Sequence, residues 1–215
     1  MKSENGRSMV EMLGVLAIIG VLSVGAIAGY SKAMMKYKLN KQSQQISTIL
    51  NNALIYAGEF SNADKNSVYI IPMLIKLKVI PEEMISGAAN YPTLHDSLNN
   101  RVSITWGNET NYSLYAMNVE MSESDYGIES CRNIVNTVKE NHADLFQIVM
   151  RRDKPDSGGI DDMTGRTYGD RYCNGDSRPC LRNMSLSDIQ DFCNECVQDE
   201  NQICTIQIMY GYVEK

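Results

Sequence analysis

Near the start of the chain, residues 6–31 read GRSMVEMLGVLAIIGVLSVGAIAGYS. Glu11 stands five residues after Gly6, and the twenty residues from Met12 to Ser31 carry no charge. About twenty apolar residues in a helix span the hydrocarbon core of a bilayer. A carboxylate at the edge of such a segment is costly in lipid and therefore indicates a functional group. The stretch predicts a membrane-length helix that carries one functional carboxylate.

The helical pattern continues beyond the apolar run. Apolar residues recur at three- and four-residue steps: Leu39, Ile46, Ile49, Leu50, Ala53, Leu54 and Ala57. Neither proline nor glycine follows residue 31 until Gly58. We therefore predict one helix from near Met9 to Ala57, with a membrane-spanning segment over residues 7–31 and an amphipathic second half over residues 32–58 that continues into the head. The apolar stripe of the second half is expected to pack on a sheet.

Charge is unevenly distributed along the 215 residues, which carry a net charge of −6. Residues 1–58 hold six Lys/Arg and two Asp/Glu, whereas the rest holds fourteen and twenty-four. The N-terminal segment is therefore basic at +4 and the remainder acidic at −10. An acidic head argues against a nucleic-acid-binding surface there, because such surfaces are basic.

Residues 59–215 form the head, and their patterns predict an α+β fold with a small antiparallel sheet. Strands are predicted at Arg101–Trp106, Tyr112–Val119, Leu145–Met150 and Cys204–Tyr212. Helices are predicted near Val68–Leu77, over Ile128–Val138 and after Ser185 or Ser187, with a turn at Pro81. A serine before an apolar run is a typical helix N-cap.

All six cysteines lie in the last 85 residues: Cys131, Cys173, Cys180, Cys193, Cys196 and Cys204. An even number of cysteines downstream of a membrane segment is typical of disulfides in an oxidising compartment. A zinc site that includes Cys193 and Cys196 is the alternative, but structural zinc sites usually need a second closely spaced pair. Cys173 and Cys180 are too far apart for that, and neither histidine lies near the cluster in sequence. We therefore predict disulfides and no metal.

Residues 153–184 are rich in aspartate, glycine, arginine and asparagine and contain few apolar residues. Such a stretch cannot build a core, so we predict a solvated loop. Asp156, Asp161 and Asp162 are candidate calcium ligands, because calcium prefers carboxylate oxygens. No stretch here fits the twelve-residue calcium loop. Calcium is therefore the alternative, and the chain is expected to need no cofactor.

The N-terminal pattern resembles the prepilin signature of type IV pilins and type II secretion pseudopilins. The residues that carry the resemblance are Gly6-Arg7-Ser8-Met9-Val10-Glu11-Met12-Leu13 and Ala17-Ile18-Ile19-Gly20. In that family a dedicated peptidase cuts after the glycine and methylates the new N-terminus. The resemblance implies a leader of residues 1–6, processing between Gly6 and Arg7, and assembly through Glu11. In that family the carboxylate is thought to pair with the N-terminal ammonium of a neighbouring subunit. Arg7 stands where the family usually has an apolar residue.

The orientation of the span follows from two opposing signals. Lys32, Lys36, Lys38 and Lys41 follow the apolar run, and the positive-inside rule alone would place the C-terminal side in the cytoplasm. The cysteines and the prepilin pattern indicate the opposite orientation, and long domains translocate largely regardless of charge. We expect a single-pass precursor in the bacterial inner membrane, with its head in the periplasm or outside. It would then move to a pilus at the cell surface.

The head also resembles that of type IVb pilins, in the segments Val79–Met84 and Arg101–Ile104. The fold implied is a pilin fold, in which a long N-terminal helix packs on a small antiparallel sheet with a disulfide-tied C-terminal region. In these pilins the tie starts from the helix after the first strands. The resemblance therefore implies Cys131 as one end and one of the three cysteines from Cys193 onward as the other. We expect Cys173 and Cys180 to form a second pair.

The sequence contains no phosphate loop, zinc-protease helix motif or nucleophile elbow, so we expect no enzymatic activity. The resemblance implies a structural subunit of a type IV pilus-like fibre that serves adhesion, motility, DNA uptake or conjugative contact. The implied partners are further copies of the chain, other pilins, the prepilin peptidase and an inner-membrane assembly platform. One alternative is a pseudopilin or minor pilin of a type II secretion system. Another, from a different class, is a single-span membrane-anchored envelope protein.

Overall fold

The computed structural model describes residues 9–56, 68–88, 91–108, 112–121, 127–153, 160–195 and 203–214. By its internal contacts the chain separates into two compact units, Met1–Lys38 and Leu39–Lys215. The long helix α1 (Met9–Ile55) contributes to both units, so its second half belongs with the head. The predicted helix from Met9 to Ala57 is confirmed to within two residues of its end.

One face of the second half of α1 is buried. The buried residues of α1 are Gln42, Gln45, Ile46, Ile49, Leu50 and Ala53. They follow one another at alternating steps of three and one residues, which places them on one side of the helix. The predicted stripe is therefore present, and two glutamines extend it towards the N-terminus.

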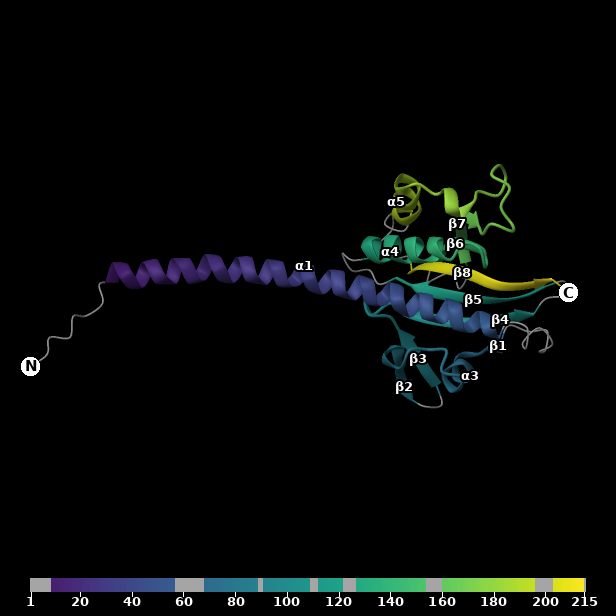
Figure 1. The fold of residues 1–215 in the computed structure, drawn as a ribbon, viewed down its shortest axis with the longest axis horizontal. Coiled ribbons are helices and arrows are strands. Elements are labelled where there is room, and N and C mark those ends of the chain that lie inside the picture. Colours follow the sequence, from purple (N-terminus) through teal and green to yellow (C-terminus); the bar gives the residue numbers. More distant parts are fainter. Residues whose placement is uncertain are drawn as a thin grey trace, which may run out of the picture. The chain divides into compact units, whose positions relative to one another are not determined.

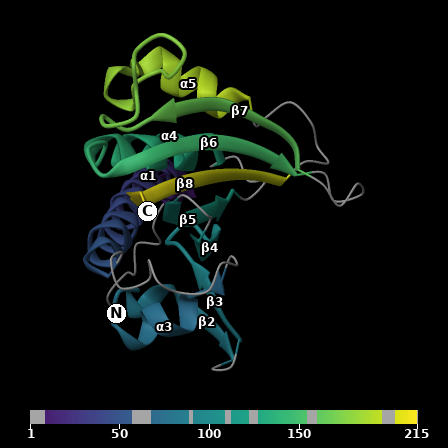
Figure 2. The same cartoon turned by 90° about the vertical axis from the view of Figure 1, so that its right-hand side faces the viewer.

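An antiparallel sheet of eight strands forms the framework of the second unit. The strands are β1 (Val68–Tyr69), β2 (Ile85–Ala88), β3 (Tyr91–His95), β4 (Arg101–Asn108), β5 (Tyr112–Glu120), β6 (Leu145–Asp153), β7 (Ile160–Tyr168) and β8 (Ile203–Glu214). Their spatial order is β2-β3-β4-β5-β8-β6-β7, and β1 also pairs with β4. Strand β8 therefore lies inside the sheet, between β5 and β6 (Figure 2).

The core is built from rows of apolar side chains that cross the strands. Ile104 pairs with Met117, Met117 with Ile208, and Ile208 with Ile148, so the row spans β4, β5, β8 and β6. All four side chains are fully buried. They share one core cluster with the apolar stripe of α1 and with Ile134 of α4. Partner residues in a ladder point to the same face, which explains why one row can pack against the helices.

Three further α-helices complete the described part of the second unit: α3 (Ile71–Lys76), α4 (Gly127–Glu140) and α5 (Leu186–Asn194). Two short 3-10 turns, η1 (Glu82–Met84) and η2 (Leu181–Asn183), connect other elements. Figures 1 and 2 both show α5 beside β7 at one end of the sheet and α3 beside β2 and β3 at the other.

The predicted α+β class is confirmed, and the four predicted strands and the three predicted head helices, α3, α4 and α5, are present. Three details of the prediction were wrong. Residues 68–95 contain the strands β1, β2 and β3 as well as a helix, residues 160–168 of the predicted loop form β7, and the sheet is larger than expected. Gly87 in β2 has a φ of +82°, and Pro92 lies in β3. Glycine and proline are depleted in strands, so they weaken the sequence signal of β2 and β3.

The buried stripe of α1 generates a stability prediction. Ile49 is completely buried, so Ile49→Ala is expected to lower the free energy of unfolding by about 2–5 kcal/mol. Ile55 lies on the same helix but is 73% exposed, so Ile55→Ala is expected to change it by less than about 0.5 kcal/mol. Urea unfolding of the full chain in detergent measures both. Equal effects would contradict the burial of this stripe.

Candidate functional site

The apolar half of α1 is the first candidate functional feature. Every large apolar side chain from Met9 to Tyr30 is at least half exposed within the single chain. An 18-residue window of α1 has a mean hydropathy of 2.4, so the helix is long and apolar enough to cross a membrane. Because exposed apolar surface of this size marks contact with lipid or protein, this half of α1 is compatible with a single-pass membrane anchor.

Glu11 lies in the first turn of α1. A carboxylate there interacts favourably with the positive end of the helix dipole. The position therefore suits an anion that must be held at the edge of an apolar segment. Gly6 and Arg7 lie outside the described residues, so processing between them stays a prediction.

Four glycines interrupt the apolar surface without interrupting the helix. A Cβ atom added at Gly14, Gly20, Gly25 or Gly29 would meet nothing within 4 Å. Within the single chain, no steric contact therefore requires glycine at these positions. Gly25 and Gly29 are four residues apart, the spacing of small residues that allows another helix to approach closely in an apolar medium. The glycines are thus available for helix packing, while α1 is continuous through all of them.

The second candidate feature is the group of disulfides that ties the C-terminal elements together. Cys131 of α4 and Cys193 of α5 form a disulfide, with their Cα atoms 5.8 Å apart. The bond is completely buried and joins two cysteines that are 62 residues apart in sequence. It is one of the pairings expected from the sequence. Cys204 of β8 is also disulfide-bonded, and Cys196 lies outside the described residues.

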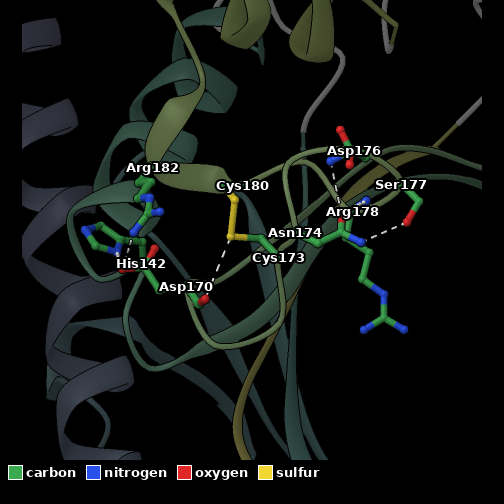
Figure 3. The surroundings of a disulfide bond; sticks show 9 residues. All are labelled: His142, Asp170, Cys173, Asn174, Asp176, Ser177, Arg178, Cys180 and Arg182. Atoms are coloured by element: carbon green, nitrogen blue, oxygen red, sulfur yellow. Dashed lines mark hydrogen bonds and ion pairs between the residues drawn. A yellow bond between two sulfur atoms is a disulfide. The ribbon is translucent and has the colours of Figure 1, made fainter.

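The expected pair Cys173–Cys180 is also present, with a Cα separation of 4.9 Å (Figure 3). The loop that it closes is fixed by Asn174. The Oδ1 atom of Asn174 accepts hydrogen bonds from the backbone N–H groups of Asp176 (3.1 Å) and Arg178 (2.9 Å). The loop is therefore exposed but internally ordered. An ordered surface of this kind loses little conformational entropy when it binds a partner.

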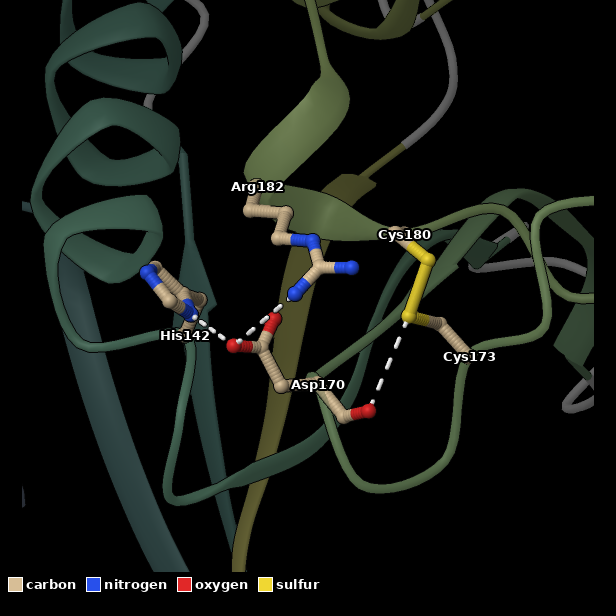
Figure 4. Close-up of polar contacts among 5 residues, drawn as sticks. All are labelled: His142, Asp170, Cys173, Cys180 and Arg182. Carbon is tan, nitrogen blue, oxygen red and sulfur yellow. Dashed lines mark hydrogen bonds and ion pairs between the residues drawn. A yellow bond between two sulfur atoms is a disulfide. The ribbon is translucent and has the colours of Figure 1, made fainter.

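A small ionic cluster lies beside this loop (Figure 4). One oxygen of Asp170 lies 2.9 Å from Nδ1 of His142 and 3.5 Å from Nη1 of Arg182. The preceding Gly169 packs so closely that a Cβ would collide with the carbonyl oxygens of Leu145 and His142. The cluster therefore fastens the start of the loop to the corner between α4 and β6. Sequence analysis missed it because His142 and Asp170 are far apart in the chain and belong to no motif.

These features are an uncovered apolar helix and an α+β unit whose C-terminal elements are held by disulfides. No protein-family model, curated protein or solved structure matches the chain. Function must therefore be inferred from the residues and geometry described above.

The structure describes the calcium candidates only in part. Asp161 and Asp162 lie in strand β7 rather than in a loop, and Asp156 lies outside the described residues. Within the part of the chain that the structure describes, no three His, Cys, Asp or Glu residues form a group suited to a metal ion. The expectation of no cofactor stays a prediction, and calcium stays its alternative.

Helix α5, which carries Cys193, begins with the predicted Ser185 cap. The Ser185 hydroxyl accepts a hydrogen bond from the Asp188 backbone N–H (3.2 Å), and the Asp188 carboxylate accepts one from the Ser185 backbone N–H (2.7 Å). This is a capping box. The hydrogen bond that the Ser185 backbone N–H donates to the carboxylate is the main reason why the pKa of Asp188 lies below its usual 3.8, and the Ser185 side chain lowers this pKa further.

The capping box predicts a pH dependence. Because the folded state lowers the pKa of Asp188, the carboxylate stabilises α5 above pH 3.8, and the stabilisation is lost as the pH falls through the lowered pKa. We expect Asp188→Asn to lower the melting temperature at neutral pH, with a difference from wild type that narrows below pH 3.8. Asp191→Asn, on the exposed surface of the same helix, is the control and should keep the wild-type pH dependence. A constant difference for Asp188→Asn would contradict the prediction.

Proposed function

We propose that this chain is a pilin-like structural subunit that is exported as a single-pass precursor, cut after Gly6 and assembled into a type IV pilus-like fibre through α1. The observation that carries the proposal is the first half of α1, an exposed apolar helix with Glu11 in its first turn. The same helix continues into a folded α+β unit. The prepilin-like pattern around Gly6 and Glu11 supports the proposed sequence of export, cleavage after Gly6 and assembly through α1.

The apolar surface gives assembly its physical basis. In the membrane, lipid covers the first half of α1. On leaving the membrane, the same surface must be covered by the corresponding helices of other subunits, because exposing it to water costs about 25 cal/mol for each Å². In this proposal Glu11 fixes the axial position of one subunit relative to the next, because a carboxylate in this apolar setting is stabilised by a cation such as a neighbouring N-terminal ammonium.

The disulfides support a location of the second unit outside the cytoplasm, because such bonds persist in oxidising compartments. The tie from Cys131 to Cys193 connects the same elements as the bond that the resemblance to type IVb pilins implies. In this proposal the ordered Cys173–Cys180 loop belongs to the surface that serves adhesion or partner recognition. The partners are other copies, other pilins, the processing peptidase and the assembly platform.

Two other assignments compete with this one. A pseudopilin or minor pilin of a secretion system would share the helix and the processing but would not form long fibres by itself. A single-span envelope protein would keep its leader and remain in the membrane. The large head and three potential disulfides favour an exposed fibre subunit over a pseudopilin or minor pilin. The lack of a catalytic motif in the sequence weighs against the envelope protein.

The deciding experiment is the mass of the N-terminal peptide, isolated from membrane and shed-fibre fractions with and without a prepilin peptidase. A peptide that begins at Arg7 only when the peptidase is present supports the proposal. A peptide that retains residues 1–6 in both samples refutes it in favour of the membrane-anchored envelope protein.

The proposed role of Glu11 generates a further prediction. Glu11→Ala and Glu11→Gln are expected to reduce shed fibres about tenfold or more, because removing one partner of a buried ion pair costs about 3–5 kcal/mol. Ser23→Ala, a polar-to-apolar change in the same apolar helix, is the control and should leave fibre yield unchanged. Immunoblots of the shed and membrane fractions measure both assembly and precursor level. Wild-type fibre yield in the Glu11 variants would contradict the assembly mechanism.

A further inference from the structure

The first buried side chains of α1 within the second unit are polar. Gln42 is completely buried and Gln45 is 3% exposed, whereas the buried residues that follow are apolar. Burying an amide is unfavourable unless its hydrogen bonds are replaced. The two glutamines therefore need specific partners, and the structure provides them.

Gln42 joins a buried group centred on Asp96. Its Nε2 atom donates to Oδ2 of Asp96 (2.6 Å) and to Oγ of Ser130 in α4 (2.8 Å). Asn100 donates to the same two atoms, each at 2.8 Å. The other carboxylate oxygen of Asp96, Oδ1, accepts hydrogen bonds from the backbone N–H groups of Leu98 and Asn100. Gln45 is held by the same turn, because its Oε1 accepts from the Ser97 backbone N–H (2.9 Å).

A second set of bonds joins α1 directly to α4. Asn133 donates to the carbonyl oxygen of Leu39 and to Oε1 of Gln42, both at 2.8 Å. Ser43 donates to Oδ1 of Asn133 (3.1 Å), and Thr137 donates to Oγ of Ser43 (2.8 Å). We call the whole set the polar collar; its side chains are those of Gln42, Ser43, Gln45, Asp96, Asn100, Ser130, Asn133 and Thr137.

The collar and the apolar stripe restrain α1 in different ways. The stripe repeats every three or four residues, so displacing the helix by one turn of 5.4 Å would still place apolar residues against an apolar core. Hydrogen bonds of 2.6–3.1 Å do not survive such a displacement. Buried polar contacts of this kind can select one register among several apolar alternatives.

We propose that the polar collar is a register lock, which fixes the axial position of α1 in the head and transmits axial load from α1 to α4. Cys131, adjacent to Ser130 of the collar, carries the load through its disulfide to Cys193 in α5. The load-bearing role rests on the proposed fibre function, whereas the register lock is a property of the folded chain.

The test compares Gln42→Met, which keeps the length of the side chain and removes its hydrogen bonds, with Gln44→Met on the exposed side of the same helix turn. Amide hydrogen exchange is measured on the full chain in detergent. Gln42→Met is expected to accelerate exchange of residues 39–50 by about tenfold, because it removes three hydrogen bonds of modest net strength. In Gln42→Met, sheet amides such as that of Ile104 are expected to exchange as in wild type. In Gln44→Met, the amides of residues 39–50 are also expected to exchange as in wild type.

Ser43→Ala is the second variant, because it removes two collar bonds with little risk to folding. It is expected to accelerate exchange in the same segment. Unchanged exchange in both variants, or an equal acceleration throughout the sheet, would overturn the register lock.

Shed fibres pulled along their axis test the load-bearing role. Fibres of Gln42→Met are expected to rupture at a lower force than those of Gln44→Met and wild type, and equal forces would overturn this role. If the wild-type chain forms no fibres, the proposed function fails, and hydrogen exchange alone decides whether the collar locks the register.

Discussion

The burial of one face of α1 against the sheet is the constraint on which the rest of the structure depends. Ile46, Ile49, Leu50 and Ala53 share a core cluster with the strands and with α4, so α1 contributes directly to the head. The first half of the same helix leaves its apolar side chains uncovered. One continuous helix therefore serves two environments, a protein core at one end and lipid or neighbouring helices at the other.

The seating combines two kinds of interaction with different roles. Apolar burial supplies most of the free energy but tolerates sliding, because it depends on area rather than direction. The hydrogen bonds of Gln42, Ser43 and Gln45 add little net free energy but are directional. The disulfide between Cys131 and Cys193 then extends the connection from α4 to α5 without relying on further packing. Stability, register and covalent continuity are thus supplied by separate sets of residues.

The sequence predicted the parts of this structure whose side chains repeat with a clear period. The stripe of α1, the alternation in β4, β5 and β8, and the Ser185 cap all have local signals. The edge strands β2 and β7 were missed because Gly87 and the polar run around Asp161 carry no such signal. Gln42 was missed as a buried residue because burial of a glutamine depends on Asp96 and Ser130, which are distant in the chain. The resemblance to type IVb pilins limited the partner of Cys131 to three cysteines, and the structure shows that the partner is Cys193.

The place of β8 in the sheet has a kinetic consequence. Strands β2 to β5 and strands β6 and β7 form two separate sets of hairpins, and β8 joins them in the sheet. Until residues 203–214 insert between β5 and β6, each set presents an unpaired edge that is prone to aggregation. Closing such distant segments is slow, because the entropy of ordering the intervening chain is lost before the contacts form. The head must therefore remain protected from self-association until its sheet is closed.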